Sequence, residues 1–245
     1  MKQKITLLYN YCIYRIKSVD EHGVHSPFIF DLVTNVIYND KAYYSYKSIE
    51  KLKDKLLNSD NQVEGKRISQ LAAELKPAKC GQLLFRLVNY FQPEQVIEIG
   101  TSLGIETAYM ASANTHTKII TLERSEQIAG IAKENFKQLG LKNIESINDA
   151  IERSLPNVIN KTEYLDFVYI KGEAQNTLHF FDQCLGKIKE SSVFVISDLY
   201  SSPEMKAVWT EIKNKDIVKV TIDLFYFGIV FFRKEQVKEH FVIRF

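Results

Sequence analysis

The sequence has few of the features that mark several classes of protein. Its three cysteines, Cys12, Cys80 and Cys184, lie far apart without a C-x-x-C pair, which argues against a disulfide framework or a zinc knuckle. No run approaches the ~20 apolar residues of a membrane span. The 32 basic and 30 acidic residues nearly cancel, so a net charge of +2 gives no reason to expect nucleic acid as a partner.

The beginning of the chain imitates a secretion signal without completing one. Lysines precede apolar residues in segment 1–16, but Asn10 and Arg15 interrupt the apolar run and no small-residue cleavage site follows. We therefore expect a soluble, cytoplasmic protein with no membrane partner. At 245 residues, 45% of them hydrophobic, the chain can bury one substantial core with an extension.

Residues 1–65 are expected to form that extension, a helical cap. Ile5, Leu8, Cys12, Ile16 and Val19 recur at spacings of three and four, which is the period of one helix face. We expect this face to pack on the protein's own core or on a partner chain, and a homodimer is compatible with it. A membrane-surface helix is the less favoured alternative, because the polar face is not strongly basic.

A second helix is expected at 28–38, with Ser26 as its N-cap and Pro27 as its first residue. His22 and His25 lie just before it, but no cysteine or carboxylate is spaced to complete a metal site with them. We expect turn hydrogen bonds there or, for His25, a contact to the substrate. The polar segment 59–65 ends the cap, and residues 66–245 form the second domain.

Strands and helices alternate through most of this second domain. The order predicts an α/β fold, a doubly wound, Rossmann-like sheet of seven mostly parallel strands. Segments 218–225 and 228–233 are expected to be two strands. Only residues 226–227 connect them, so they must form an antiparallel C-terminal hairpin. The alternating residues 241–245 suggest one more strand.

The stretch 96–109, VIEIGTSLGIETAY, predicts a strand, a tight turn and a helix. The apolar run is too short and β-branched for a helix, and Gly100 and Gly104 allow close approach of a ligand to the backbone. Glu123 follows Gly100 by 23 residues, near the ~20-residue offset at which an acid after the second strand binds ribose hydroxyls. The spacing predicts a ligand that contains adenosine.

The residues of the turn favour S-adenosylmethionine (SAM) over NAD. A pyrophosphate needs glycine in the middle of the turn, where Ser102 stands. Glu98, directly before the turn, would repel a pyrophosphate but suits a ligand with ammonium and sulfonium charges. An NAD-linked oxidoreductase is therefore the least favoured class.

Four motifs, EIGTSLG, the LE after the second strand, NDA after the third and the DLFYFGIVFF hairpin, resemble class I SAM-dependent methyltransferases over about residues 80–233. The chain looks closest to bacterial small-molecule O-methyltransferases. The resemblance implies that the glycine turn lies under the methionine part of SAM, Glu123 holds the ribose, and Asp149 and Ala150 lie beside adenine. The candidate cofactor-binding residues are Glu98, Gly100, Thr101, Ser102, Gly104, Glu123, Arg124, Asp149 and Ala150.

The residues at the ends of the fourth and fifth strands differ from those of the metal-dependent O-methyltransferases that the chain resembles. Those enzymes end the fourth strand in aspartate and the fifth in an aspartate-asparagine or aspartate-aspartate pair. Here Lys171 and the pair Ser197-Asp198 stand at these places. Magnesium and calcium prefer several oxygen ligands, so an ammonium in place of a carboxylate should abolish such a site. We expect no catalytic metal.

Asp198 is the candidate base, and Lys171 is a candidate to stabilise an oxyanion nucleophile or, if buried, to act as a base. The structural alternatives are an ion pair of Lys171 with Asp198 or Glu98, and capping of the next helix by Asp198. Tyr200 joins His25 as a candidate substrate contact. Trp209, at helical spacing with apolar residues, is expected to pack in the core.

These observations predict a SAM-dependent methyltransferase that acts on a small-molecule acceptor without a divalent metal. The alternative is a catalytically degenerate methyltransferase-fold protein that binds SAM or a partner.

Overall fold

The computed structural model describes the backbone of residues 2–245 and the side chains of residues 6–245. The chain divides into two compact units, one of residues 40–158 and one of residues 1–39 with 159–245. The expected cap, 1–65, is therefore shared between the two units. Its boundary at residue 65 stays a prediction.

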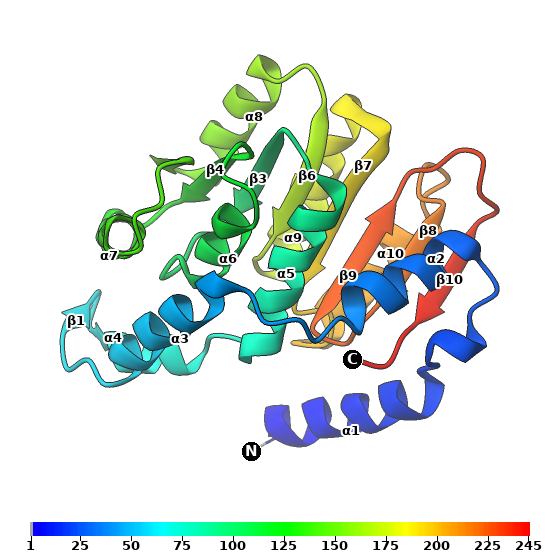
Figure 1. Ribbon diagram of the computed structural model, residues 1–245, viewed down its shortest axis with the longest axis horizontal. Coiled ribbons are helices and arrows are strands. Elements are labelled where there is room, and N and C mark those ends of the chain that lie inside the picture. The colour runs from blue at the N-terminus through cyan, green and yellow to red at the C-terminus, as the bar shows by residue number, and fades with distance from the viewer. Residues whose placement is uncertain (1) are drawn as a thin grey trace. The chain divides into compact units, whose positions relative to one another are not determined.

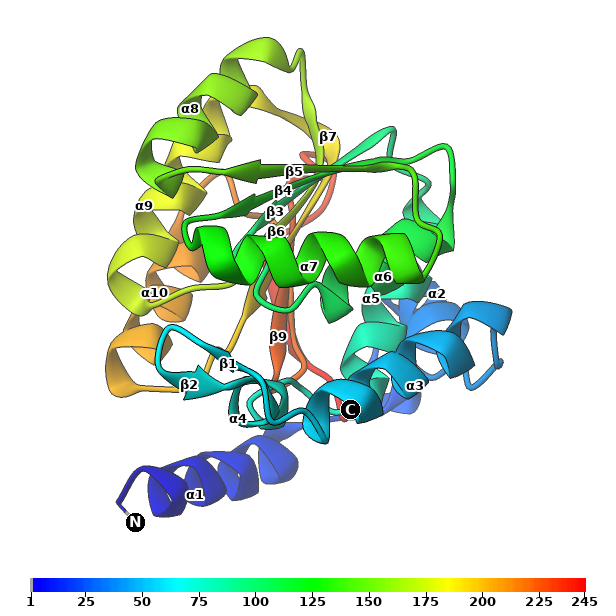
Figure 2. The same ribbon diagram turned by 90° about the vertical axis from the view of Figure 1, so that its left-hand side faces the viewer.

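The unit of residues 40–158 contains three parallel strands in the order β3-β4-β5; Figure 1 labels β3 and β4, and Figure 2 labels all three. They are β3 (Gln95–Ile99), β4 (Lys118–Glu123) and β5 (Ile144–Asn148). The helices between and after them are α6 (Ile105–Ala113), α7 (Glu126–Gln138) and α8 (Ile151–Lys161), the last of which extends past residue 158. The expected alternation of strand and helix is confirmed here.

The remaining elements of this unit precede β3. They are α3 (Tyr44–Leu57), a small hairpin of β1 (Gln62–Val63) and β2 (Lys66–Arg67), α4 (Ile68–Ala73) and α5 (Ala78–Phe91). The apolar face of α3 packs against α5 and α6 in one buried cluster that includes Ile49, Leu52, Phe85 and Tyr109. This cluster holds the helix that follows the glycine turn.

The other unit contains five strands in the order β10-β8-β9-β7-β6. They are β6 (Leu165–Ile170), β7 (Ile188–Ser197), β8 (Val220–Asp223), β9 (Phe227–Phe231) and β10 (Glu239–Val242). β6 and β7 run parallel, whereas β8 and β9 form the antiparallel hairpin and β9 pairs with β7. The expected mostly parallel strands with an antiparallel C-terminal hairpin are confirmed, and β10 adds a strand parallel to β8.

Helices cover both faces of these five strands. Figure 2 shows α9 (Ala174–Cys184) and α10 (Pro203–Asn214) on one side of β9 and α2 (Pro27–Leu32) on the other. Trp209 of α10 is buried as expected, and a side chain at Gly228 of β9 would meet its ring at 2.6 Å. Ser26 and Pro27 begin α2 as expected, and a π-helix, η2 (Val33–Ile37), continues it.

The first helix, α1 (Lys2–Lys17), packs through a different face from the expected one. Leu8 and Ile16 are 63% and 80% exposed, so their expected packing on the protein's own core is wrong; the side chain of Ile5 lies outside the described residues. Tyr14, only 2% exposed, holds the helix instead, because its hydroxyl donates to the carbonyl of Ile243 at 2.5 Å. Aromatic packing of Tyr14 on Phe225, with ring centroids 5.4 Å apart, overrides the aliphatic pattern.

Candidate active site

The turn after β3 contains three residues in the left-handed region of backbone conformation. Gly100 has φ +95°, Ser102 +52° and Gly104 +76°. The amides of Gly100 and Thr101 both donate to the carbonyl of Leu122 in β4, at 3.0 and 3.3 Å. The turn is therefore tied to the neighbouring strand, and Ser102 adopts a conformation that glycine would adopt at lower cost.

Glu98 lies beneath this turn as the centre of a buried hydroxyl network. Its side chain is 0% exposed, and its Oε2 accepts hydrogen bonds from Thr107 of α6 at 2.5 Å and Thr121 of β4 at 2.6 Å. Thr101 and Thr121 share a further hydrogen bond of 2.6 Å. Glu98 thus joins β3, β4 and α6 around the turn, and a direct contact of its carboxylate with the cofactor stays a prediction.

The Glu123 carboxylate joins the loops that follow β3 and β4. Its Oε2 accepts from the backbone amide of Ser102 at 2.9 Å, and its Oε1 accepts from that of Ser125 at 3.1 Å. Each carboxylate oxygen has a second lone pair, so both can still accept from a ligand hydroxyl. The spacing of 23 residues between Gly100 and Glu123 therefore does bring the acid to the turn.

Asp149 follows β5 and is placed next to Glu123 through the backbone, since its amide donates to the carbonyl of Glu123 at 3.1 Å. Its carboxylate accepts from Arg153, with 2.7 Å between Oδ2 and Nε, and from the amide of Ala150 at 2.8 Å. The Arg153 guanidinium lowers the pKa of Asp149 below its ordinary value. The Arg153 partner had not been predicted, although the i,i+4 spacing could have indicated it.

Arg124 and Ala150 complete the predicted cofactor-binding set. Ala150 is exposed just before α8, and Arg124 is exposed and pairs with Glu152 at 3.3 Å. The turn, Glu123 and Asp149 thus meet at the ends of three adjacent strands of one unit.

Asp198 follows β7 in the other unit and has an unusual backbone. Its φ is +62°, and its amide donates to the carbonyl of Tyr226 at 2.9 Å. Ser197 donates through its hydroxyl to Asp198 Oδ2 at 2.7 Å. The carboxylate is partly exposed at the end of a buried strand and sits on a strained backbone, a combination that is typical of functional sites.

Tyr200 is the predicted substrate contact whose surroundings the structure defines best. Its hydroxyl donates to Asp223 Oδ2 at 2.6 Å, and its ring stacks on Phe225 with centroids 5.1 Å apart. Burial, together with the neighbouring Asp223 charge, raises the pKa of Tyr200. Because the hydroxyl is engaged inside the unit, the ring is the part of Tyr200 left to contact an acceptor.

Asp223, which the sequence reasoning missed, is a buried carboxylate at the end of β8. Its Oδ1 accepts from the amide of Phe225 at 2.9 Å, while Oδ2 accepts from Tyr200. Burial raises the pKa of Asp223 above its ordinary value, more than these hydrogen bonds lower it. The segment alternates apolar Val218, Val220 and Ile222 with polar Lys219, Thr221 and Asp223, so nothing in the pattern indicates that this acid is buried.

Stability should therefore depend on pH through Asp223. The Asp223 carboxyl keeps its proton to higher pH in the folded state than in the unfolded chain. The stabilisation of the folded state by this protonation is therefore complete below about pH 4, the ordinary pKa of aspartate, and is lost as pH rises through the raised pKa. We expect the unfolding free energy of the wild type, relative to Asp223→Asn, to fall across that window by at most about 1.4 kcal/mol per pH unit. Urea titrations at several pH values measure this difference, and parallel curves for the two proteins would contradict it.

Lys171 and His25 have less defined surroundings. Lys171 directly follows β6 and is partly exposed, and His25 is exposed after the short helix η1 (Glu21–Gly23). Among the described side chains, no group of three or more His, Cys, Asp or Glu is placed to hold a metal ion. The roles of Lys171 and His25, and catalysis without a metal, stay predictions.

A hollow of about 600 Å³ lies beside the loops that follow β6 and β7. Leu178 of α9 and Val208 of α10 supply its apolar part, and Ser201 and Ser202 come from the loop after Asp198. The hollow thus borders the segment that carries the candidate base. Its lining residues are Glu173, Ala174, Gln175, Leu178, Ser201, Ser202, Glu204 and Val208.

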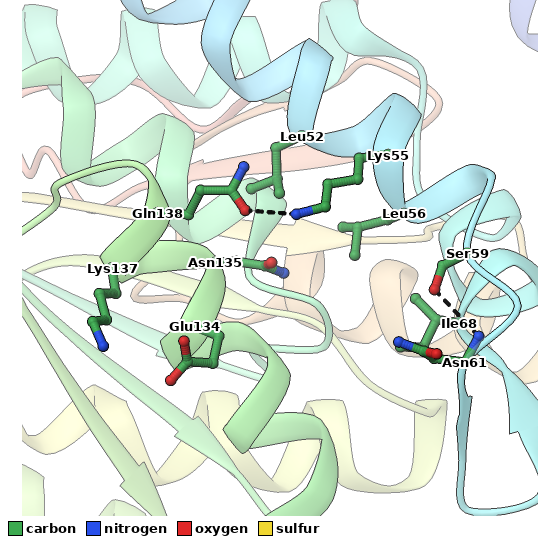
Figure 3. A pocket seen from close by; sticks show the side chains of 10 residues that line it. All are labelled: Leu52, Lys55, Leu56, Ser59, Asn61, Ile68, Glu134, Asn135, Lys137 and Gln138. Atoms are coloured by element: carbon green, nitrogen blue, oxygen red, sulfur yellow. Dashed lines mark hydrogen bonds between the residues drawn. The ribbon is translucent and has the colours of Figure 1, made fainter.

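A second hollow, of about 510 Å³, lies between α3 and α7 in the unit of residues 40–158 (Figure 3). Leu52, Leu56 and Ile68 line it together with polar side chains, and Lys55 donates to Gln138 at 3.1 Å across its edge. None of the predicted site residues lines it. Asn135, which lines it, reaches the turn, because its amide nitrogen donates to the carbonyl of Leu103 at 2.9 Å.

Comparison with solved structures supports the fold. An O-methyltransferase from Bacillus cereus in complex with SAH is 18% identical, with a TM-score of 0.61 over 79% of this chain and 93% of that one. The SAH-bound methyltransferase PaMTH1 from Podospora anserina is 11% identical, with a TM-score of 0.64 over 85% of this chain and 97% of that one. At these identities the likeness shows a shared fold.

Two curated proteins match shorter parts of the sequence. A catechol O-methyltransferase of Mycobacterium tuberculosis is 24% identical over 124 residues, which are 50% of this chain and 56% of that protein. A protein-L-isoaspartate O-methyltransferase of Petrotoga mobilis is 38% identical over 81 residues, 33% of this chain and 34% of that protein. The chain thus spans about half and about a third of the lengths of these relatives.

The sequence pattern of the family described as O-methyltransferase matches residues 34–219. This range includes the glycine turn, Glu123, Asp149, Lys171 and Asp198. Within residues 2–245 no helix is both long and apolar enough to cross a membrane. Since the match extends over most of the chain, this protein belongs to the O-methyltransferase family.

Proposed function

We propose that the protein is a SAM-dependent methyltransferase that methylates an oxygen of a small molecule without a divalent metal. The observation that carries the proposal is the Glu123 carboxylate, held at the glycine turn by the amides of Ser102 and Ser125. Solved structures with this fold contain SAM or SAH. The acceptor class follows the family and the catechol O-methyltransferase among the relatives.

The residues at the turn fit SAM on chemical grounds. Glu123 presents two acceptor oxygens for the ribose hydroxyls, and Gly100, which has no side chain, would let the methionine part approach the backbone. Asp149 and Ala150 would lie beside adenine. When bound, SAM supplies a methyl group activated by its sulfonium, and positioning alone can be worth ~7 to 11 kcal/mol.

The residues after β6 and β7 would act on the acceptor. Asp198 would take the proton from the acceptor hydroxyl, because Ser197 holds its carboxylate in place and leaves it partly exposed. The ammonium of Lys171 would stabilise the resulting oxyanion. An ammonium where metal-dependent relatives carry a carboxylate supports a reaction without a divalent metal. The hollow that borders Ser201 and Ser202 offers room for part of the acceptor.

Thermal unfolding with SAM and with SAH tests the cofactor part of the proposal. A ligand present at 100 times its Kd stabilises the folded state by about 2.7 kcal/mol, so millimolar SAM should raise the Tm of the wild type by several degrees. Glu123→Ala should abolish that shift, because the ribose loses its acceptor. The shift is compared within each variant, since Glu123→Ala also frees two backbone amides.

Glu126→Ala is the matched control, since Glu126 is an exposed carboxylate in the first turn of α7. It should keep the full shift. A flat response of the wild type at millimolar SAM and SAH would overturn the proposal. Binding of SAM without SAH formation on a panel of catechols and phenols would instead favour the catalytically degenerate alternative.

A further inference from the structure

One apolar face of α1 lies open to solvent. Leu8, Tyr9, Cys12 and Ile16 follow each other at helical spacing on this face, and we refer to them as the outer stripe. All four are exposed, and Leu8, Tyr9 and Ile16 are among the large apolar side chains most exposed in the described part of the chain. Exposed apolar side chains gathered in this way indicate an interaction surface.

The opposite face of α1 fixes how the helix is turned. Tyr14 is buried and donates to the carbonyl of Ile243, and the amide of Phe245 donates to the Tyr14 hydroxyl at 2.9 Å. Tyr11 packs on Phe225 with ring centroids 5.0 Å apart. Figure 1 shows α1 running along the outside of its unit. The helix cannot roll to hide the outer stripe without breaking these contacts.

The charge of α1 has one sign. Its sequence, KQKITLLYNYCIYRIK, contains Lys2, Lys4, Arg15 and Lys17 and no acid. Arg15 and Lys17 are exposed on either side of the outer stripe, and no ion pair to them is found among residues 6–245.

The nearest acids in sequence, Asp20 and Glu21, lie beyond the end of α1 and keep their negative charge. Asp20 accepts from the amide of His22, and Glu21 lies 3.7 Å from the ring of the same histidine. Arg244, which donates to the carbonyl of Ser18 at 3.5 Å, adds a further positive charge at the end of the helix. Within α1 itself, however, every charged residue beside the outer stripe is basic.

We propose that the outer stripe binds the surface of an anionic phospholipid membrane, with α1 lying in the plane of the headgroups. Apolar side chains enter the boundary of the acyl chains while flanking lysine and arginine contact anionic headgroups. A second copy of this chain suits the surface less well, because the charged residues of α1 are all basic and two such helices would repel each other. The polar face of α1 is not strongly basic, which alone disfavours a membrane-surface helix. The exposure of the outer stripe outweighs that ground and favours a membrane over the expected absence of a membrane partner.

Cosedimentation of the full chain with vesicles tests the proposal. One set of vesicles contains phosphatidylcholine alone, and the other contains phosphatidylcholine and phosphatidylglycerol in equal parts. We expect the partition coefficient to be about tenfold or more higher on the anionic vesicles, and to fall when salt shortens the range of the charges. The double variant Leu8→Ser/Ile16→Ser should bind about tenfold or more weakly, and so should Arg15→Gln/Lys17→Gln.

Val237→Ser is the matched control, since Val237 is 79% exposed but lies outside α1. It should bind like the wild type, and all variants should keep the wild-type Tm because they alter exposed side chains. Absence of binding to anionic vesicles, equal binding to both vesicle types, or unchanged binding of Leu8→Ser/Ile16→Ser would overturn the proposal. So would a wild-type dimer in light scattering that Leu8→Ser/Ile16→Ser converts to a monomer without vesicle binding.

Discussion

Gly104→Ala should lower the free energy of unfolding by about 2 to 5 kcal/mol. Gly104 has φ +76°, where a Cβ costs about 1 to 2 kcal/mol. The new methyl group would also lie 2.5 Å from Cε1 of Phe136 and 3.1 Å from Cβ of Ala132, and overpacking of this kind costs about 1 to 3 kcal/mol. Neither neighbour can yield easily, because both are buried in α7.

Urea unfolding of the two proteins measures this effect, and Gly130→Ala is the matched control. Gly130 lies inside α7, and a Cβ at this position would have no neighbouring atom within 4 Å, so alanine there should stabilise the protein by about 0.4 to 1 kcal/mol. Gly104→Ala should also weaken the SAM-dependent thermal shift, since α6 and the turn would have to move. A loss below about 1 kcal/mol for Gly104→Ala would show that the turn relaxes around the methyl group.

The cofactor-binding residues of the candidate site could be predicted from the sequence, because rules on residue type and short spacing determine their positions. A buried β-branched run must be a strand, and glycine after it allows a tight turn, so the place of Gly100 and Gly104 follows from local chemistry. Parallel neighbours then bring the acid that ends β4 to that turn, which is why Glu123 reaches Ser102. Residue type and spacing were sufficient here.

The partners of these residues were not readable in the same way. Glu98 was expected to face the ligand, yet the hydroxyls that hold it come from Thr107 and Thr121, nine and 23 residues along the chain. Asp223 and Tyr200 likewise meet only because the hairpin folds back beside β7. Contacts of this kind depend on tertiary packing, which no periodicity in one sequence reports.

In the first helix, too, tertiary packing decided what the sequence pattern could not. Its aliphatic residues have the period of a buried face, but three tyrosines compete with them on the same helix. Tyr11 and Tyr14 prevail because they find an aromatic partner in Phe225 and a backbone carbonyl at Ile243. The spacing of the aliphatic residues therefore identified a helix correctly, but it could not determine which face of that helix is buried.

Asp198→Asn should reduce the rate of SAH formation by about 100-fold or more, with the SAM-dependent thermal shift unchanged. General bases contribute about 10² to 10⁴ to rates, and asparagine cannot take the proton. The substitution is conservative in structure, because asparagine tolerates the φ of +62° better than most residues do and its oxygen can still accept from Ser197. A loss of rate can thus be assigned to the missing carboxylate.

The rate is measured as SAH formed with 3,4-dihydroxybenzoate, a catechol probe. Asp198→Ala separates chemistry from backbone strain, since it should match Asp198→Asn in rate but lose about a further 1 kcal/mol of stability at the positive φ. Glu211→Gln, an exposed carboxylate change on α10, should leave the rate unchanged. Wild-type turnover by Asp198→Asn would exclude Asp198 as the base and leave Lys171, the candidate that follows β6 in the same unit, as the group to test next.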